Sequence, residues 1–99
     1  MIKHVETMEE LKAEIAKGDV LLDFFATWCG PCSMLAPVIE DLDKEMDIKV
    51  IKVDVDELPA IAQKFRVMSI PTLVLFKDGK PSNVATGYMP LENLRNFVK

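Results

Sequence analysis

Residues 20–32 read VLLDFFATWCGPC, and this segment gives the clearest indication of the fold. Its first seven residues are apolar except for Asp23, which is the pattern of a strand covered on both faces in the interior of a parallel sheet. After the second cysteine, apolar side chains at positions 35, 38, 39 and 42 recur at helical spacing. The stretch therefore predicts a buried strand that leads into a helix, with a Cys-Gly-Pro-Cys sequence at the junction.

The flanking sequence continues this alternation of strands and helices. Thr7 and Glu10 fit a capping box that begins a helix over residues 8–17, and Gly18 suits the left-handed residue after a helix. Further strands are predicted at 2–5, 48–55, 72–76 and 83–86, and further helices at 59–65 and from 90 onward, with a hairpin turn at 77–80. We expect an α/β fold in three layers, a central mixed sheet of about five strands flanked by about four helices.

The composition is that of one folded domain. The 99 residues are 49% hydrophobic and 28% charged, which suffices for one core and not for two of ordinary size, so we expect a single domain over residues 1–99. A net charge of −4 argues against nucleic acid as a partner. No apolar run approaches the ~18 residues of a membrane span, and the first residues lack the apolar segment of a secretory leader. We expect a cytoplasmic monomer without a membrane partner.

Cys29 and Cys32 are the only cysteines, and three roles compete for them. A structural zinc needs four ligands, and His4 is the only other soft candidate. A crosslink that closes so short a loop would stabilise the fold by only about 2 kcal/mol in the chain-entropy model. The third role is reversible dithiol-disulfide exchange, which uses every residue of the motif.

For exchange, the two cysteines would have different tasks. Cys29 lies where the strand ends and the helix begins, so free backbone N–H groups and the helix dipole would favour its thiolate as the nucleophile. Cys32, one helical turn later, is placed to attack the mixed disulfide and to release the substrate reduced. Pro31, after Gly30, stiffens the turn between the two sulfurs.

From about residue 5 to residue 98 the chain resembles the thioredoxin family. Residues 28–32 repeat the family's active-site pentapeptide, Asp23 stands at its buried acid, and Ile70-Pro71-Thr72 matches its cis-proline loop, with Gly79 and Gly87 also in place. The resemblance implies the thioredoxin fold and a thiol-disulfide oxidoreductase that reduces disulfides in partner proteins. It also implies no cofactor beyond the Cys29–Cys32 disulfide and a thioredoxin reductase as electron donor.

Two charged residues are candidates for proton transfer. Asp23 sits among large apolar neighbours, so we expect it to be buried and its pKa to be raised, and the resemblance implies that it relays a proton to or from Cys32. Lys52 matches the lysine that thioredoxins keep near this acid, although an ordinary solvated strand lysine would have the same sequence pattern.

The substrate surface is predicted around Cys29. The resemblance implies that Pro71 is cis and that the backbone of Ile70 pairs with an extended substrate chain. Methionine suits a surface that fits varied partners, although core packing explains methionines as well. The candidate substrate-binding residues are Trp28, Met68, Ile70, Pro71, Gly87 and Met89.

Two residues depart from the family's usual pattern, and two other functions remain open. Phe25 stands where many thioredoxins carry a second tryptophan, and Ser33 replaces a basic residue.

One alternative function is that of an oxidant or isomerase of the same fold, against which Gly30-Pro31 argues. The other is a binding module whose redox activity is incidental. His4 falls in the first strand, and the sequence assigns it no chemistry.

Overall fold

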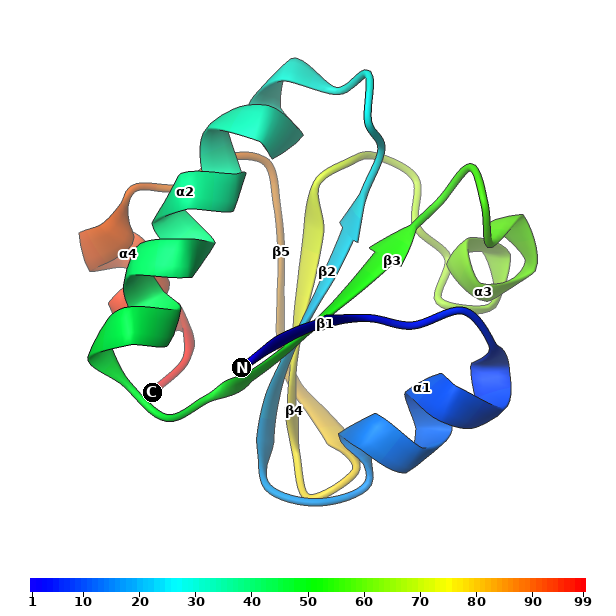
Figure 1. Cartoon of the computed structure of the whole chain (residues 1–99), viewed down its shortest axis with the longest axis horizontal. Helices are drawn as coiled ribbons and strands as arrows, with labels where there is room; N and C mark the ends of the chain where they lie inside the picture. The colour runs from blue at the N-terminus through cyan, green and yellow to red at the C-terminus, as the bar shows by residue number, and fades with distance from the viewer.

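The computed structural model describes all residues, 1–99, and its centre is a five-stranded mixed sheet. The strands lie in the order β1-β3-β2-β4-β5, with β1 and β2 parallel to β3, and β4 antiparallel to both β2 and β5. Along the chain the elements are β1 (Ile2–His4), α1 (Met8–Ile15), β2 (Asp19–Phe25), α2 (Gly30–Glu45), β3 (Lys49–Asp54), α3 (Pro59–Lys64), β4 (Thr72–Lys77), β5 (Lys80–Thr86) and α4 (Leu91–Phe97). The predicted mixed sheet with four helices is confirmed (Figure 1).

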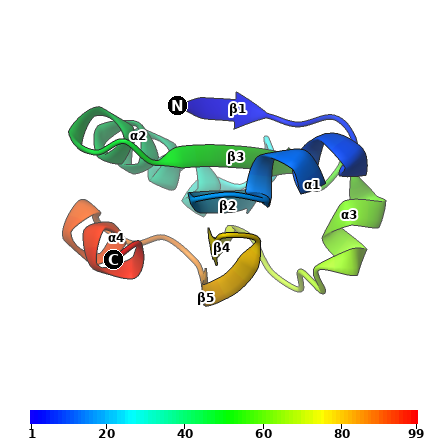
Figure 2. The ribbon, with the colours of Figure 1, turned by 90° about the horizontal axis from the view of Figure 1, so that it is seen from below.

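The helices cover the two faces of the sheet in pairs. Figure 2, in which the sheet is seen from below, shows α2 and α4 on one side and α1 and α3 on the other. Alternation along β2 explains this arrangement, because successive side chains of a strand point to opposite faces. Leu21 packs with the core under α2 and α4, whereas Val20, Leu22 and Phe24 pack with the core under α1 and α3. Asp23 follows Leu21 by two residues and therefore faces α2.

The ends of the elements differ in detail from the sequence prediction. The Thr7 hydroxyl accepts a hydrogen bond from the Glu10 N–H at 3.1 Å, as a capping box requires, but the Glu10 carboxylate accepts from the N–H of Glu6. Helix α1 ends at Ile15, two residues before the predicted end, and Gly18 follows in the left-handed region at φ +73°. Strand β5 begins at Lys80, earlier than position 83, because an edge strand needs no apolar alternation to form.

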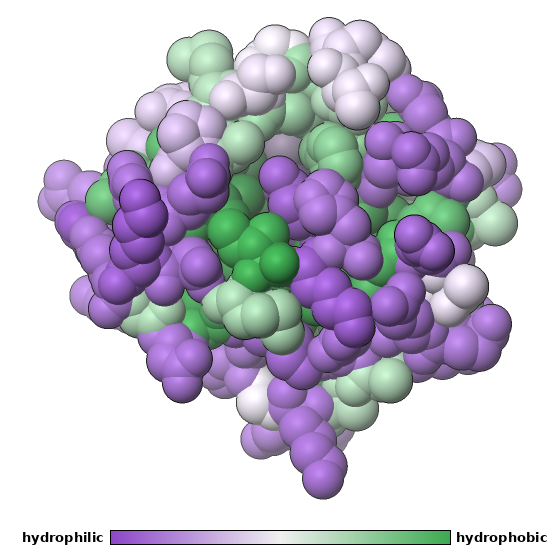
Figure 3. All heavy atoms as spheres, in the orientation of Figure 1, coloured by the Kyte–Doolittle hydropathy of each residue, from purple (hydrophilic) through white to green (hydrophobic).

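The surface at the β2–α2 junction differs from the flanks of the molecule. Charged and other hydrophilic side chains cover the flanks, whereas the end that carries this junction, at the top of the view, is mostly of intermediate hydropathy (Figure 3). None of the helices combines the length and the apolar character needed to cross a membrane.

Candidate redox site

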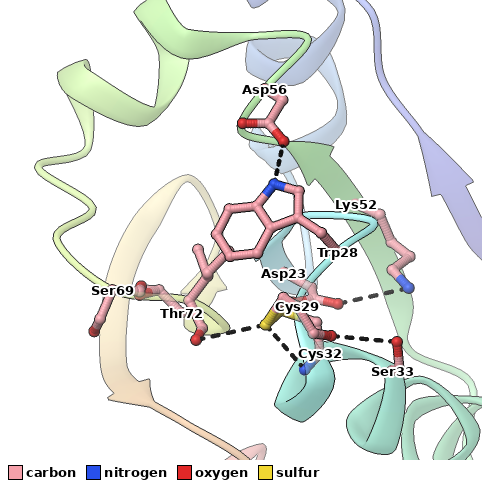
Figure 4. The surroundings of a disulfide bond; sticks show 10 residues. Asp23, Trp28, Cys29, Cys32, Ser33, Lys52, Asp56, Ser69 and Thr72 are labelled. Carbon is pink, nitrogen blue, oxygen red and sulfur yellow. Dashed lines mark hydrogen bonds and ion pairs between the residues drawn. A yellow bond between two sulfur atoms is a disulfide. The ribbon is translucent and has the colours of Figure 1, made fainter.

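The two cysteines lie at the junction of β2 and α2 and are joined by a disulfide. Cys29 caps the amino end of α2, and its Sγ accepts a hydrogen bond from the N–H of Cys32 at 3.2 Å. Pro31 occupies the first turn, where a missing N–H costs no helical bond, and the Ser33 hydroxyl donates to the Cys29 carbonyl at 3.2 Å (Figure 4). The predicted position of Cys29 at the start of the helix, with Cys32 one turn later, is confirmed.

Asp23 is buried beneath this turn, as its apolar neighbours indicated. Asp23 is 2% exposed, its Oδ2 lies 3.7 Å from the Lys52 Nζ, and its Oδ1 has no hydrogen-bond partner. Burial raises the pKa of Asp23 to about 6, and the nearby Lys52 ammonium opposes that rise. The carboxyl can therefore gain or lose a proton close to neutral pH, and Lys52 is held at the site and not solvated on a strand face.

The loop before β4 lies against the disulfide. Its Ile70–Pro71 peptide bond is cis, and the Ile70 carbonyl oxygen lies 3.8 Å from the Cys29 Sγ. The N–H of Gly87 donates to the Pro71 carbonyl at 2.8 Å, and Gly87 has a φ of +89°, which glycine adopts without strain. The structure thus brings Ile70, Pro71 and Gly87 together with Cys29, although these residues are far apart in the sequence.

The apolar residues expected around Cys29 separate into two groups. Trp28 and Met68 are 71% and 94% exposed, and with Ile70 they border a hollow of about 200 Å³ next to the disulfide. The remaining lining residues are Val55, Ala62, Val67 and Ser69. Met89 is half-buried and packs against the core under α2 and α4, whereas the half-buried Ile70 packs against the cluster that contains Cys29 and Cys32.

Asp56 is a site residue that sequence reasoning missed. The Trp28 indole N–H donates to its Oδ2 at 2.7 Å, which ties an exposed ring to the loop that follows β3 (Figure 4). An aspartate in a loop after a strand is common, and no spacing connects it to a tryptophan 28 positions earlier. Only the parallel pairing of β2 with β3 brings the ends of these two strands together.

Replacing Asp56 by alanine is expected to weaken substrate binding. The indole would lose its hydrogen bond to a carboxylate, and an exposed bond of this kind contributes about 1 kcal/mol, which corresponds to about a fivefold rise in KM. The KM for a disulfide-bonded protein substrate tests this, with Trp28 fluorescence anisotropy as the report on ring mobility. Glu57→Ala, one residue later in the same loop, is the matched control, since Asp54→Ala would remove the carboxylate that accepts the backbone N–H of Asp56. An unchanged KM in Asp56→Ala would show that the bond does not support binding.

No group of three or more histidine, cysteine, aspartate or glutamate side chains is arranged to hold a metal ion. Of the three roles considered for Cys29 and Cys32, the disulfide at a helix terminus beside a titratable acid matches reversible exchange.

Comparison with known proteins identifies the family. The thioredoxin family model matches residues 2–99. A thioredoxin of Staphylococcus saprophyticus is 53% identical over 87 residues, covering 86% of this chain and 84% of the relative, and one of Staphylococcus haemolyticus is 56% identical over 86 residues, covering 85% and 83%. Among solved structures, a mutant thioredoxin of Halobacterium salinarum superimposes with a TM-score of 0.92 at 40% identity, covering 98% of this chain and 87% of that one.

The fold, the motif at residues 28–32 and these relatives agree, and the resemblance stated from the sequence is confirmed. The chain belongs to the thioredoxin family and is a thiol-disulfide oxidoreductase that acts by dithiol-disulfide exchange.

Proposed function

We propose that the chain is a general reductant of protein disulfides in the cytoplasm, with Cys29 as the attacking thiol and Cys32 as the resolving thiol. The observation that carries the assignment is the position of Cys29 as the cap of α2, where its sulfur accepts the Cys32 N–H. Backbone N–H groups and the positive end of a 16-residue helix stabilise a thiolate at this position.

The exchange runs in two steps. The Cys29 thiolate attacks one sulfur of the substrate disulfide, forms a mixed disulfide, and releases the other substrate sulfur as a thiolate that takes a proton. The Cys32 thiol then loses its proton and attacks the Cys29 sulfur, which forms the Cys29–Cys32 disulfide and releases the second substrate sulfur. Two electrons pass to the substrate, and the chain's own cysteine pair carries them without a further cofactor.

Asp23 accepts the proton of Cys32 in the second step. Its burial below α2, its pKa of about 6 and its unpartnered Oδ1 support this role, because a carboxylate without hydrogen-bond partners is a ready proton acceptor. Lys52 balances its charge from 3.7 Å. Gly30 and Pro31 serve the reaction by shaping the turn that keeps the two sulfurs within bonding distance.

Disulfide-containing proteins bind over the hollow beside Trp28. The exposed Trp28 and Met68 supply apolar contact, and Ile70, which lies outside the sheet ladder, offers its backbone to an extended chain. Gly87 lets that chain approach Pro71 closely, and Met89 lies at the margin of the surface. A thioredoxin reductase binds the same surface and reduces the Cys29–Cys32 disulfide. The chain works as a monomer.

The reduction potential of the Cys29–Cys32 couple tests the direction of electron flow. Equilibration with glutathione buffers, followed by the fluorescence of Trp28, is expected to give a couple more reducing than the cytosolic glutathione poise of about −220 to −260 mV. Trp28 is the sole tryptophan and adjoins Cys29, so the signal reports on this bond alone. A couple more oxidising than glutathione would contradict the proposed role as a reductant and would indicate an oxidant or isomerase of the same fold.

A further inference from the structure

Lys52 is held on two sides, which is unusual for a lysine. Its Nζ lies 3.7 Å from the Asp23 Oδ2 and 4.8 Å from the centroid of the Phe25 ring, and its side chain is only 14% exposed. A lysine stem is long and flexible, and the ammonium ordinarily extends into water. Attraction between a cation and an aromatic face therefore acts here together with an ion pair to keep the ammonium inward.

The Phe25 ring is in turn supported by His4. The two ring centroids are 5.6 Å apart and the rings meet edge to face at 81°. In the sheet, His4 on β1 is the register partner of Lys52 on β3, and Lys52 is the register partner of Asp23 on β2. A row of side chains thus crosses three strands, from the exposed edge of the sheet to the buried acid, and Phe25 lies beside this row.

Lys52 also borders the hollow that reaches the resolving cysteine. This hollow measures about 250 Å³ and shares no lining residue with the one beside Trp28, so the two open on different sides of the disulfide. Besides Cys32 and Lys52, its lining residues are Phe25, Ala26, Thr27, Ser33 and Ala36. A substrate that covers the Trp28 side would leave this second opening to water.

We propose that the rings of Phe25 and His4 are positioning residues, which hold the Lys52 ammonium beside Asp23 at the opening that reaches Cys32. This inference rests on the proposed role of Asp23 as proton acceptor. In the resolving step the Cys32 thiol gives its proton to the Asp23 carboxylate as its sulfur attacks Cys29. The proton then passes to water in the second hollow, while the substrate still occupies the Trp28 side.

The position of the ammonium matters because two opposed effects act on Asp23. Burial favours the neutral acid, and a cation at 3.7 Å favours the carboxylate. The other ionisable groups that face this cluster are His4 from β1 and, from α2, Glu40 and the reduced Cys32, whereas β4 presents the apolar Leu73. If the rings were removed, Lys52 would turn outward, and the pKa of Asp23 would rise further.

Phe25→Leu tests the proposal, measured in the oxidised protein, in which the cysteines do not titrate. The pKa of Asp23 is followed by NMR of its carboxyl carbon, and Lys52→Met gives the rise that accompanies complete loss of the ammonium. We expect Phe25→Leu to give at least half of that rise, His4→Ala to give a smaller rise, and Phe25→Trp, which keeps an aromatic face, to stay at the parent value. The pH midpoint of mixed-disulfide resolution should move by the same amount as the pKa.

An unchanged pKa of Asp23 in Phe25→Leu, with a raised pKa in Lys52→Met, would overturn the positioning role, and so would an unchanged pKa in Lys52→Met. A pKa that rises as expected while the midpoint of resolution stays fixed would support the positioning and refute the role of Asp23 as proton acceptor. His4 lies on an exposed edge strand, so His4→Ala provides the same reading if the leucine variant does not fold.

Discussion

Replacing Cys32 by serine is expected to lower the steady-state reduction of a protein disulfide by at least about a thousandfold, while a covalent complex with the substrate accumulates. Cys29 keeps its place as the cap of α2 and can still attack, because the N–H of residue 32 that it accepts belongs to the backbone. Without a second thiol the mixed disulfide has no intramolecular route to resolution. Intact-protein mass spectrometry under non-reducing conditions would show the sum of the two masses.

Cys29→Ser is the matched comparison, with the same loss of turnover but no covalent complex. A covalent complex that forms with Cys29→Ser and not with Cys32→Ser would show that Cys32 is the attacking thiol and Cys29 the resolving thiol. The double variant, Cys29→Ser with Cys32→Ser, separates catalysis from a binding role. Cellular activity that survives in the double variant would mean that the chain acts there as a binding module.

Replacing Asp23 by asparagine is expected to stabilise the oxidised protein at pH 8 and to change its stability little at pH 4. The pKa of this carboxyl is about 6 in the folded chain, against an ordinary value of about 3.9 in an unfolded one. A difference of about two between these pKa values corresponds to roughly 3 kcal/mol of free energy of unfolding.

The sign follows from the protons that each state binds. Below about pH 4 the Asp23 carboxyl is protonated in the folded and in the unfolded chain, so its ionisation does not change the free energy of unfolding. As the pH rises from about 4 to about 6, the unfolded chain has lost its proton and the folded chain still keeps it, so stability falls; above about pH 6 the penalty is complete. Asparagine has no proton to lose, so the variant avoids the penalty.

Urea unfolding of both proteins at pH 4 and pH 8 measures this effect. Asp19→Asn is the control, because Asp19 lies on the same strand, is exposed, and forms only a surface ion pair with Lys77, which is worth about 0–1 kcal/mol. A gain in stability for Asp23→Asn that is equal at the two pH values would show that ionisation of the buried carboxyl is not its cause.

The sequence predicted those features whose signals are local. The buried strand at 20–26, the helix with Pro31 in its first turn and the hairpin at 77–80 each follow from a short pattern, and the family resemblance supplied the cis bond at Pro71. The burial of Asp23 was predicted because its neighbours in the strand are apolar.

The contacts that were missed join side chains from different strands. Neither the bond from Trp28 to Asp56 nor the edge-to-face contact of His4 with Phe25 beside Lys52 has a pattern along the chain, since each depends on which strands are neighbours and in what register. His4 shows this most clearly, because its place in a short edge strand gave no indication of the ring that it contacts. Strand order is a long-range property, and local periodicity does not determine it.

The disulfide closes a single helical turn, with the two Cα atoms 5.2 Å apart and no distant element tied by the bond. Opening it therefore rearranges one turn and leaves the sheet and both cores as they are. We therefore expect the reduced and the oxidised chain to present nearly the same surface to a binding partner. If the reductase binds the same surface as the substrates, as proposed above, the two partners exclude each other. Reduction by the donor and reduction of the substrate would then alternate, as in a ping-pong mechanism, because the partners compete for one surface and not because the chain changes shape.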